Sequence, residues 1–172
     1  MRPEAIKLFT SITPALLRNA LLKGTVIAGI GIILLTLAGT YIPPYLLTYL
    51  GPFILFIGGG LITWGLLPYR RLYSIENSPN ELIFINGKQV QFIAKGREVY
   101  TIPFEMIENL DYLKKDNIYG IAVYLKKETS KKIIVHNPRF NMAAFQKNSK
   151  KKYHCDLFIP YFSERSFNRI QN

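Results

Sequence analysis

The spacing of apolar and polar residues divides the chain into two parts. Residues 24–69 form a run of 46 positions without a charged side chain, most of them apolar. From residue 70 onward, apolar and polar residues alternate over short stretches that end in turn-forming residues. A long apolar run is typical of membrane-spanning helices, whereas alternation is typical of half-buried strands. The pattern therefore predicts helices in the first part and a β domain in the second.

The uncharged run is long enough for two membrane crossings, because one crossing needs about 20 apolar residues. Pro43 and Pro44 divide the run, since proline has no backbone N–H and disfavours helix in the residue before it. We expect helices at residues 24–41 and 45–67, which together form a transmembrane hairpin within residues 24–69. Aromatic residues that suit the two membrane interfaces lie near the ends of these helices: Tyr41, Tyr45, Tyr49, Trp64, Tyr69 and Tyr73.

The flanking charges predict the orientation of the hairpin. Arg18 and Lys23 precede the uncharged run and Arg70 and Arg71 follow it, whereas the turn between the helices has no charge. Positively charged flanks remain in the cytoplasm, so we expect a multi-pass protein with both termini cytoplasmic. The richness in Lys, Asn and Ile is typical of AT-rich bacterial genomes and indicates a bacterial inner (plasma) membrane. The competing interpretation is a cleaved signal peptide, with a 23-residue basic region before the run.

Small residues recur along both expected helices and allow helix backbones to approach closely. They either pack the hairpin on itself or form a docking seam for another membrane subunit. The candidate helix-packing residues are Gly24, Ala28, Gly31, Gly58, Gly59, Gly60 and Thr63. No ionisable residue lies within the run, which argues against a proton relay or ion pathway carried by this chain alone.

Residues 1–23 form an N-terminal cytoplasmic segment with apolar residues at helical spacing, namely Ile6, Leu8 or Phe9, Ile12 and Leu16. Pro14 interrupts this pattern. We expect an amphipathic segment that lies in the membrane interface or a helix that packs on the cytoplasmic domain.

Residues 70–172 read as six or seven antiparallel strands. Asn86-Gly87 and Lys95-Gly96 mark tight turns between strands, and the stretch 121–126 pairs back with 132–136 in an expected hairpin. A short helix is expected at 141–152 and another from Ser163, a plausible capping residue, toward the C-terminus. The expected fold class is thus a membrane protein of α+β type. It combines the hairpin with a cytoplasmic antiparallel barrel or sandwich and a short C-terminal helix.

Three segments of this domain resemble the bacterial pleckstrin-homology-like (PH-like) family, which is often fused to paired membrane spans. They are the hairpin 82–93, the strand–Pro–turn–strand stretch 102–110 and the hairpin 120–136. The resemblance covers about residues 70–138 and implies a PH-like, non-catalytic module that binds protein or lipid. The order of a two-helix hairpin and such a domain is also similar to that of the photosystem I assembly proteins of plastids and cyanobacteria.

Candidate chemistry is sparse. A single cysteine, Cys155, excludes an intramolecular disulfide, and Cys155 with His136 and His154 does not have the spacing of a zinc site. Glu105, Glu108 and Asp111 are interpreted as part of a solvated turn, and no nucleophile or phosphate-loop motif occurs. We therefore expect a protein that is not an enzyme, with no catalytic, metal or cofactor-binding residues and no small-molecule substrate.

Basic clusters are the remaining candidates for contacts, in a chain with a net charge of +11. They are either a solvated basic surface or a contact for anionic headgroups, an acidic protein or RNA. Because stacking aromatics at regular spacing are missing, nucleic acid is not expected as a partner. The candidate anionic-lipid or partner contacts are Lys126, Lys127, Lys131, Lys132, Lys147, Lys150, Lys151 and Lys152.

These observations predict an accessory or assembly subunit of an inner-membrane complex. Its helices would dock to a membrane-protein partner or to a second copy of the chain, and its PH-like domain would bind a protein partner. The alternative is an anionic-lipid-binding sensor module in which the lysine clusters contact membrane lipids.

Overall fold

The computed structural model describes residues 5–85, 87–115, 118–126 and 132–171. These residues form two compact units. A helical unit comprises Ile12–Ser74, and a β unit combines Met1–Ser11 with Ile75–Asn172. The helical unit is thus inserted in the sequence between two segments of the β unit.

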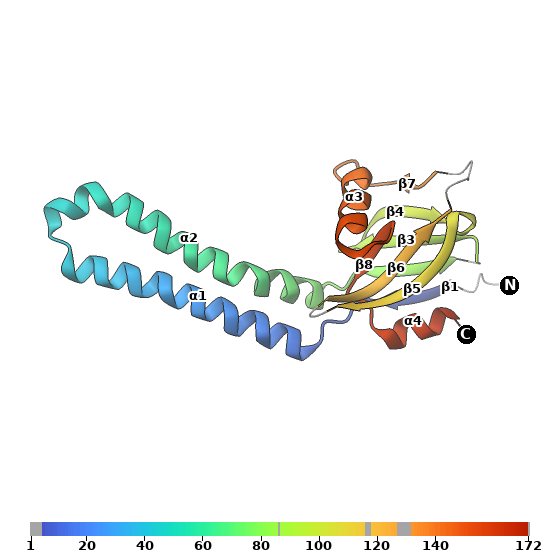
Figure 1. Cartoon of the computed structure of the whole chain (residues 1–172), viewed down its shortest axis with the longest axis horizontal. Helices are drawn as coiled ribbons and strands as arrows, with labels where there is room; N and C mark the ends of the chain where they lie inside the picture. Colours follow the sequence, from blue (N-terminus) through green and yellow to red (C-terminus); the bar gives the residue numbers. More distant parts are fainter. Residues whose placement is uncertain (1–4, 86, 116–117, 127–131, 172) are drawn as a thin grey trace. The chain divides into compact units, whose positions relative to one another are not determined.

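The helical unit contains two long antiparallel helices, α1 (Pro14–Tyr41) and α2 (Pro44–Asn77), drawn in Figure 1. Both expected helices are present, and the break between them falls at the predicted proline pair. Both helices begin with a proline, whose missing N–H is not needed in the first helical turn. On the side of the basic flanks, α1 begins ten residues before the uncharged run and α2 ends eight residues after it.

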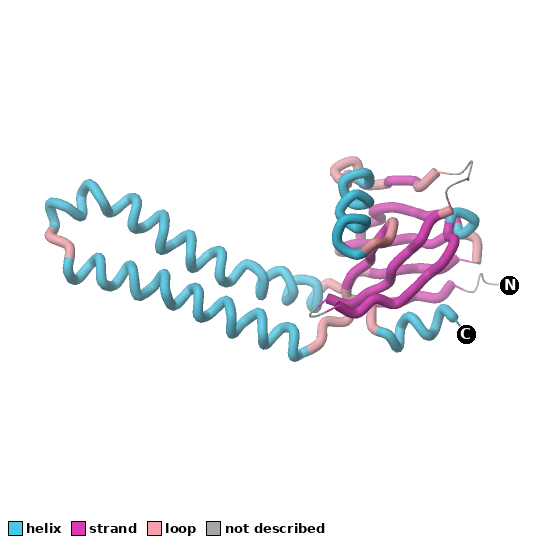
Figure 2. Tube along the Cα trace, viewed as in Figure 1, coloured by secondary structure: helices cyan, strands magenta, loops and turns pink. Residues whose placement is uncertain are grey.

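The β unit contains two antiparallel sheets, coloured magenta in Figure 2. The first sheet has the strand order β1 (Ala5–Phe9), β2 (Glu81–Ile85), β3 (Gln89–Ala94), β4 (Arg97–Pro103), β7 (Ile134–Val135). The second has the order β5 (Ile107–Lys115), β6 (Ile118–Leu125), β8 (Leu157–Pro160). A 3₁₀ turn, η1 (Phe104–Met106), joins β4 to β5. The expected turns after β2 and β3 are confirmed, and Gly87 and Gly96 adopt the positive φ angles that such turns require.

The N-terminal segment differs from the helical expectation. Ala5–Phe9 forms strand β1, which pairs antiparallel with β2 from Phe9 opposite Glu81 to Ala5 opposite Ile85. Leu8 is 2% exposed in the core of the β unit. The apolar positions fit both a helix and a strand, and pairing with β2, 70 residues away, decides between them. Pro14 begins α1 and does not interrupt an earlier helix.

The expected hairpin between 121–126 and 132–136 is wrong. Strand β6 pairs with β5 and β8, whereas β7 pairs with β4 of the other sheet. Ile121 and Val123 are buried because the two sheets enclose them, and this burial produces the alternation that suggested a local hairpin. One of the three segments that carry the family resemblance is therefore built differently.

One apolar cluster fills the space between the two sheets. Its least exposed members are Ile102, Ile121, Leu157 and Phe162, each 0% exposed. Two short helices pack against the sheets: α3 (Met142–Tyr153) against β8 and α4 (Glu164–Gln171) against β1. Both were expected. The side chain of Asn141 accepts the Ala144 N–H at 2.9 Å and that of Ser163 accepts the Ser166 N–H at 3.2 Å, so both helices have capped N-termini.

Candidate functional site

Four of the seven predicted helix-packing residues lie between α1 and α2. Gly24, Ala28, Gly31 and Gly58 are buried in the helical unit. A Cβ added to Gly24 would lie 2.5 Å from the carbonyl oxygen of Gly65, and one added to Gly31 would lie 2.7 Å from that of Gly58. These glycines therefore permit direct backbone contact, and they pack the hairpin on itself.

The other three predicted residues face away from this seam. A Cβ on Gly59 or Gly60 would meet nothing within 4 Å, and Thr63 is exposed with its hydroxyl donating to the Gly59 carbonyl at 2.8 Å. They line a shallow groove of about 480 Å³ on α2, next to the exposed rings of Phe56 and Trp64. The structure thus separates two sets that the sequence places side by side.

The lysines of α3 are exposed and cover its outer surface. Lys147, Lys150, Lys151 and Lys152 are all exposed, whereas Ser149 is buried and accepts the Phe158 N–H of β8 at 3.1 Å. Ser149 therefore lies on the side of the helix that faces the sheet, and Met142 and Phe145 of the same helix pack against the core. Because residues three and four apart share one helical face, Lys147, Lys150 and Lys151 form one basic stripe.

Asp156 partly neutralises this stripe. One carboxylate oxygen of Asp156 lies 2.9 Å from the Lys150 ammonium, and the other accepts the Leu125 N–H at 2.8 Å. Asp156 therefore links α3 to the end of β6. Because Lys150 is largely exposed, the ion pair itself contributes at most about 1 kcal/mol.

The remaining predicted lysines lie elsewhere or outside the described residues. Lys126 follows β6 and is exposed, and its backbone N–H donates to the Met106 carbonyl at 2.9 Å. Lys132 is also exposed. Lys127 and Lys131 lie outside the residues that the structure describes. Lys126 directly follows Leu125, and Asp156 contacts both the Leu125 N–H and the Lys150 ammonium, so Lys126 is connected to the basic stripe of α3 through Asp156.

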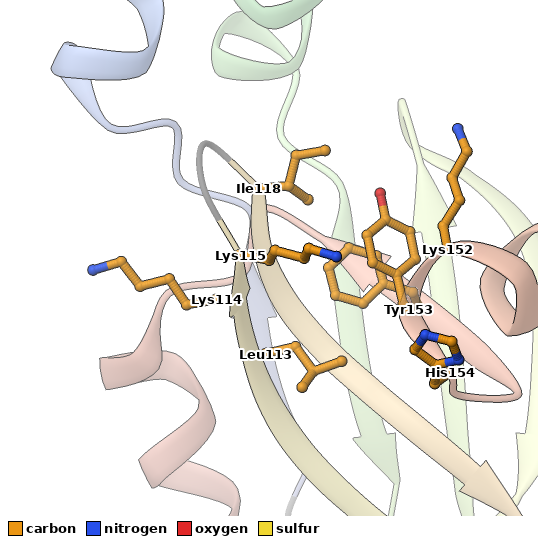
Figure 3. A pocket seen from close by; sticks show the side chains of 8 residues that line it. Leu113, Lys114, Lys115, Ile118, Lys152, Tyr153 and His154 are labelled. Carbon is orange, nitrogen blue, oxygen red and sulfur yellow. The ribbon is translucent and has the colours of Figure 1, made fainter.

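A basic pocket of about 110 Å³ lies between the β5–β6 strand ends and the end of α3. Lys115 and Lys152 line it together with His154, and the Lys115 side chain extends toward the ring of Tyr153 (Figure 3). The Tyr153 ring stacks on Phe158 at a centroid distance of 4.0 Å. Its other lining residues are Leu113, Lys114 and Ile118. We name this site the exit pocket, because the chain leaves the β unit toward α1 at this end of the β5–β6 ladder.

His136 lies between a hydroxyl and a carboxylate, as the base does in a catalytic triad of nucleophile, base and acid. Here the three residues are Thr101, His136 and Glu98. Its Nε2 lies 2.9 Å from the Thr101 hydroxyl, and its Nδ1 lies 4.0 Å from a Glu98 carboxylate oxygen. Thr101 is only 6% exposed in the middle of β4, so a substrate has no access to its hydroxyl. The contact links the segment after β7 to β4.

Cys155 and His154 are adjacent in the sequence but differ in exposure. Cys155 is 2% exposed, and burial raises the pKa of its thiol from the ordinary 9.0 to about 11, which keeps it protonated and unreactive. His154 is exposed and adopts a left-handed conformation that ends α3. Among the described residues, no group of three or more His, Cys, Asp or Glu side chains is placed to hold a metal ion.

Sequence reasoning missed Lys114 and Lys115, and it noted Gly65 only as one of several small residues in the second helix without selecting it as a helix-packing residue. Gly65 has a detectable signal, because Gly51, Gly58 and Gly65 are spaced by seven residues, as are Gly24, Gly31 and Ala38 on the other helix. A seven-residue spacing keeps small residues on one helix–helix seam. Lys114 and Lys115 give no such signal, because their neighbours in the exit pocket are about 40 residues away in the sequence.

Neither a family model, nor a curated protein, nor a solved structure matches this chain.

Proposed function

We propose that this protein is a non-catalytic accessory or assembly subunit of a bacterial inner-membrane complex. In this proposal α1 and α2 cross the membrane, both termini are cytoplasmic, and the β unit is a PH-like domain that binds a protein partner. The observation that carries the proposal is the pair of long helices that expose apolar side chains on almost all sides.

The exposure of these helices supports membrane placement. Both are long and apolar enough to cross a bilayer, and only 17% of the most apolar window of α1 and 11% of that of α2 are buried. Tyr41 is 80% exposed and Phe56 is 83% exposed. A core helix of a soluble protein is mostly buried, and soluble proteins rarely expose an apolar surface of this extent. Lipid is the environment that suits such a surface.

Strand pairing supports a common side for both flanks of the hairpin. The strands β1 and β2 precede and follow the helical unit, and they are paired neighbours in one sheet. Two segments of one sheet must lie on the same side of a membrane, which requires an even number of crossings. Cleavage after the first helix would remove Leu8 from the core, so the pairing also disfavours the signal-peptide interpretation. The basic flanks favour the cytoplasmic side.

The outward groove on α2 supports a partner within the membrane. Gly59 and Gly60 leave the backbone of α2 open, and Phe56 and Trp64 stand on either side of this opening. An approaching helix gains close van der Waals contact at such a position. The seam between α1 and α2 does not use these two glycines, so they remain free for a second protein.

Two of the three family-like segments are formed in the β unit. The β2–β3 hairpin covers residues 82–93, and β4, η1 and β5 follow the strand–Pro–turn–strand order of residues 102–110. Two packed antiparallel sheets followed by a C-terminal helix are compatible with a PH-like domain. We propose this assignment on the arrangement of these elements.

The test is purification of the full-length protein in mild detergent, with sizing and mass spectrometry of what accompanies it. We expect a stoichiometric partner that is lost in Gly59→Leu and retained in Gly29→Leu, since Gly29 is also an open glycine but lies on α1. A partner that remains with Gly59→Leu contradicts docking through the α2 groove. A chain that purifies alone from membranes contradicts the accessory-subunit proposal.

The second candidate function is anionic-lipid binding through the basic surface of the β unit. The stripe of Lys147, Lys150 and Lys151 on α3 favours it, because all three side chains are exposed. Replacement of Lys150, Lys151 and Lys152 by Gln in the full-length protein should weaken binding to anionic vesicles in a salt-dependent manner. Binding that responds neither to salt nor to these substitutions contradicts this candidate.

A further inference from the structure

The chain leaves and re-enters the β unit at one defined end, which we name the exit end. The Ser11 N–H donates to the Tyr161 carbonyl at 2.8 Å, and the Tyr161 N–H donates to the Tyr119 carbonyl at 2.6 Å. The Tyr119 hydroxyl in turn donates to the Ser11 carbonyl. The Thr10 N–H donates to the Asn80 carbonyl at 2.9 Å. These bonds tie the segment before α1 to the segment before β2 and to the start of β6.

The exit end carries basic side chains from the end of β5 and from the connection between β3 and β4. In the β5–β6 ladder, Lys114 lies opposite Tyr119 and Lys115 lies opposite Ile118. In the other sheet, Ile93 lies opposite Glu81, which lies opposite Phe9, so the following turn with Lys95 and Arg97 is also at this end. The basic side chains at this end are all exposed, namely Lys95, Arg97, Lys114 and Lys115. Lys152 of the exit pocket is exposed as well.

The exit pocket therefore opens at the end of the β unit to which the helices are attached. Its apolar lining comes from Leu113, Ile118 and the stacked rings of Tyr153 and Phe158. Three lysines line the pocket: the Lys115 side chain is directed toward Tyr153, whereas the side chains of Lys114 and Lys152 extend away from that ring at the rim (Figure 3). A pocket with an apolar lining and ammonium groups suits an anion that is attached to an apolar molecule.

We propose that the exit pocket binds the phosphate of an anionic glycerophospholipid from the membrane that α1 and α2 cross. This inference rests on the membrane placement proposed above. Only Ile12 and Thr13 separate Ser11 from α1, and three residues separate the end of α2 from β2. Arg18, which marks the headgroup level, lies four residues into α1, about 6 Å along its axis. Connections of two and three residues thus limit how far the exit end can lie from the residues that flank the proposed membrane spans.

Lys152 belongs both to the exit pocket and to the predicted lysines of α3, whereas Lys114 and Lys115 were not predicted and lie at the exit end. Lys88 and Lys126 lie at the opposite ends of their strands: the Lys88 carbonyl accepts the Phe104 N–H at 2.8 Å, and the Lys126 N–H donates to Met106. Strand β6 has eight residues, so Lys126 is about 25 Å from the exit end. Screening over such a distance removes most of its attraction to a charged surface.

The experiment is a titration of the full-length protein in dodecylmaltoside with phosphatidylglycerol, followed by thermal unfolding. A ligand that binds only the folded state stabilises it by RT ln(1 + [L]/Kd), so the rise of the unfolding temperature with lipid concentration yields a dissociation constant. The test variant is Lys115→Gln with Lys152→Gln, and the matched control is Lys88→Gln with Lys126→Gln. Parallel titrations use phosphatidylcholine and inorganic phosphate at equal ionic strength.

We expect phosphatidylglycerol to bind the wild-type protein and the control variant equally. Binding to the test variant should be about 30-fold weaker, or about fivefold for each lysine. Phosphatidylcholine and inorganic phosphate should have no effect. An equal loss in the control variant would mean diffuse charge attraction, and an equal effect of inorganic phosphate would mean a free-anion site; either result overturns the proposal. The proposal is also overturned if the test variant binds phosphatidylglycerol as tightly as the wild-type protein does.

Membrane extraction separates this inference from the proposed function. A protein that alkaline carbonate releases from membranes contradicts the membrane placement, and the lipid proposal fails with it. A protein that stays in the membrane but does not respond to phosphatidylglycerol contradicts the exit-pocket proposal alone.

Discussion

The backbone contact between Gly24 and Gly65 allows a sharp test of the helix seam. A Cβ at Gly24 would lie 2.5 Å from the Gly65 carbonyl oxygen, about 0.9 Å closer than the 3.4 Å at which ordinary contact begins. The obstacle is backbone, which cannot rotate away, so α1 and α2 must separate locally in Gly24→Ala. A gap of this size forfeits a quarter to a half of the dispersion energy of the atoms along the seam. Overpacking of this kind costs about 1–3 kcal/mol.

Gly29→Ala is the matched control for this substitution. It lies on the same helix, and its added Cβ would meet nothing within 4 Å. Both substitutions gain the same helix propensity, about 0.5–1 kcal/mol, so their difference reports the seam alone. We expect Gly29→Ala to be slightly more stable than the wild-type protein, and Gly24→Ala to be about 1–3 kcal/mol less stable than Gly29→Ala.

The assay is equilibrium unfolding of the full-length protein by sodium dodecyl sulfate in dodecylmaltoside micelles, followed by circular dichroism. Gly65→Ala should behave like Gly24→Ala, because its Cβ would lie 2.7 Å from the Gly24 carbonyl oxygen. If Gly24→Ala and Gly29→Ala unfold at the same detergent composition, the helices do not pack through this seam and the reasoning is refuted.

Four further predictions concern the β unit. Tyr100→Phe should leave stability unchanged or raise it by about 1 kcal/mol in chemical denaturation, because the buried hydroxyl has no hydrogen-bond partner among the described residues; a clear loss would reveal a partner. Iodoacetamide should label Cys155 about 100-fold more slowly in the folded than in the unfolded protein at pH 8, since burial raises the pKa of the thiol to about 11. Equal labelling rates would show an accessible thiol. The free energy of unfolding should also fall as pH rises from 9 toward 11, because the unfolded chain loses the thiol proton first. The variant Cys155→Ala should lack this fall. Leu8→Ala should destabilise the β unit by about 2–5 kcal/mol, as expected for a core residue, whereas an unchanged unfolding midpoint would mean that β1 does not contribute to the core.

Most of the secondary structure could be predicted from the sequence because its signals are local. The uncharged run, the proline pair at its centre and the Asn-Gly turn each act on residues within a few positions. The caps at Asn141 and Ser163 are equally local, since each side chain bonds an N–H three residues ahead. The existence of α1, α2, α3, α4 and the β2–β3 and β3–β4 hairpins follows from such signals.

The pairing of distant segments could not be predicted in this way. Apolar alternation predicts that a segment is a strand, but many partners satisfy the same alternation. Strand β7 pairs with β4 and not with the nearer β6, and β1 pairs with β2 across the whole helical unit. These choices depend on how both sheets enclose one core, which no short window of sequence contains.

The candidate sites follow the same division. The sequence by itself determined that glycines crowd the helices and lysines crowd the β unit, because composition is local. Only the tertiary structure decided that Gly58 closes the seam between α1 and α2 while the adjacent Gly59 faces outward, since a rotation of about 100° per residue separates them on the helix. Likewise, only the fold places Lys115 and Lys152 around one pocket. Side chains that are distant in the sequence meet when backbone pairing and burial bring their elements together. The free energy of this pairing and burial depends on the whole folded chain and not on any short segment of sequence.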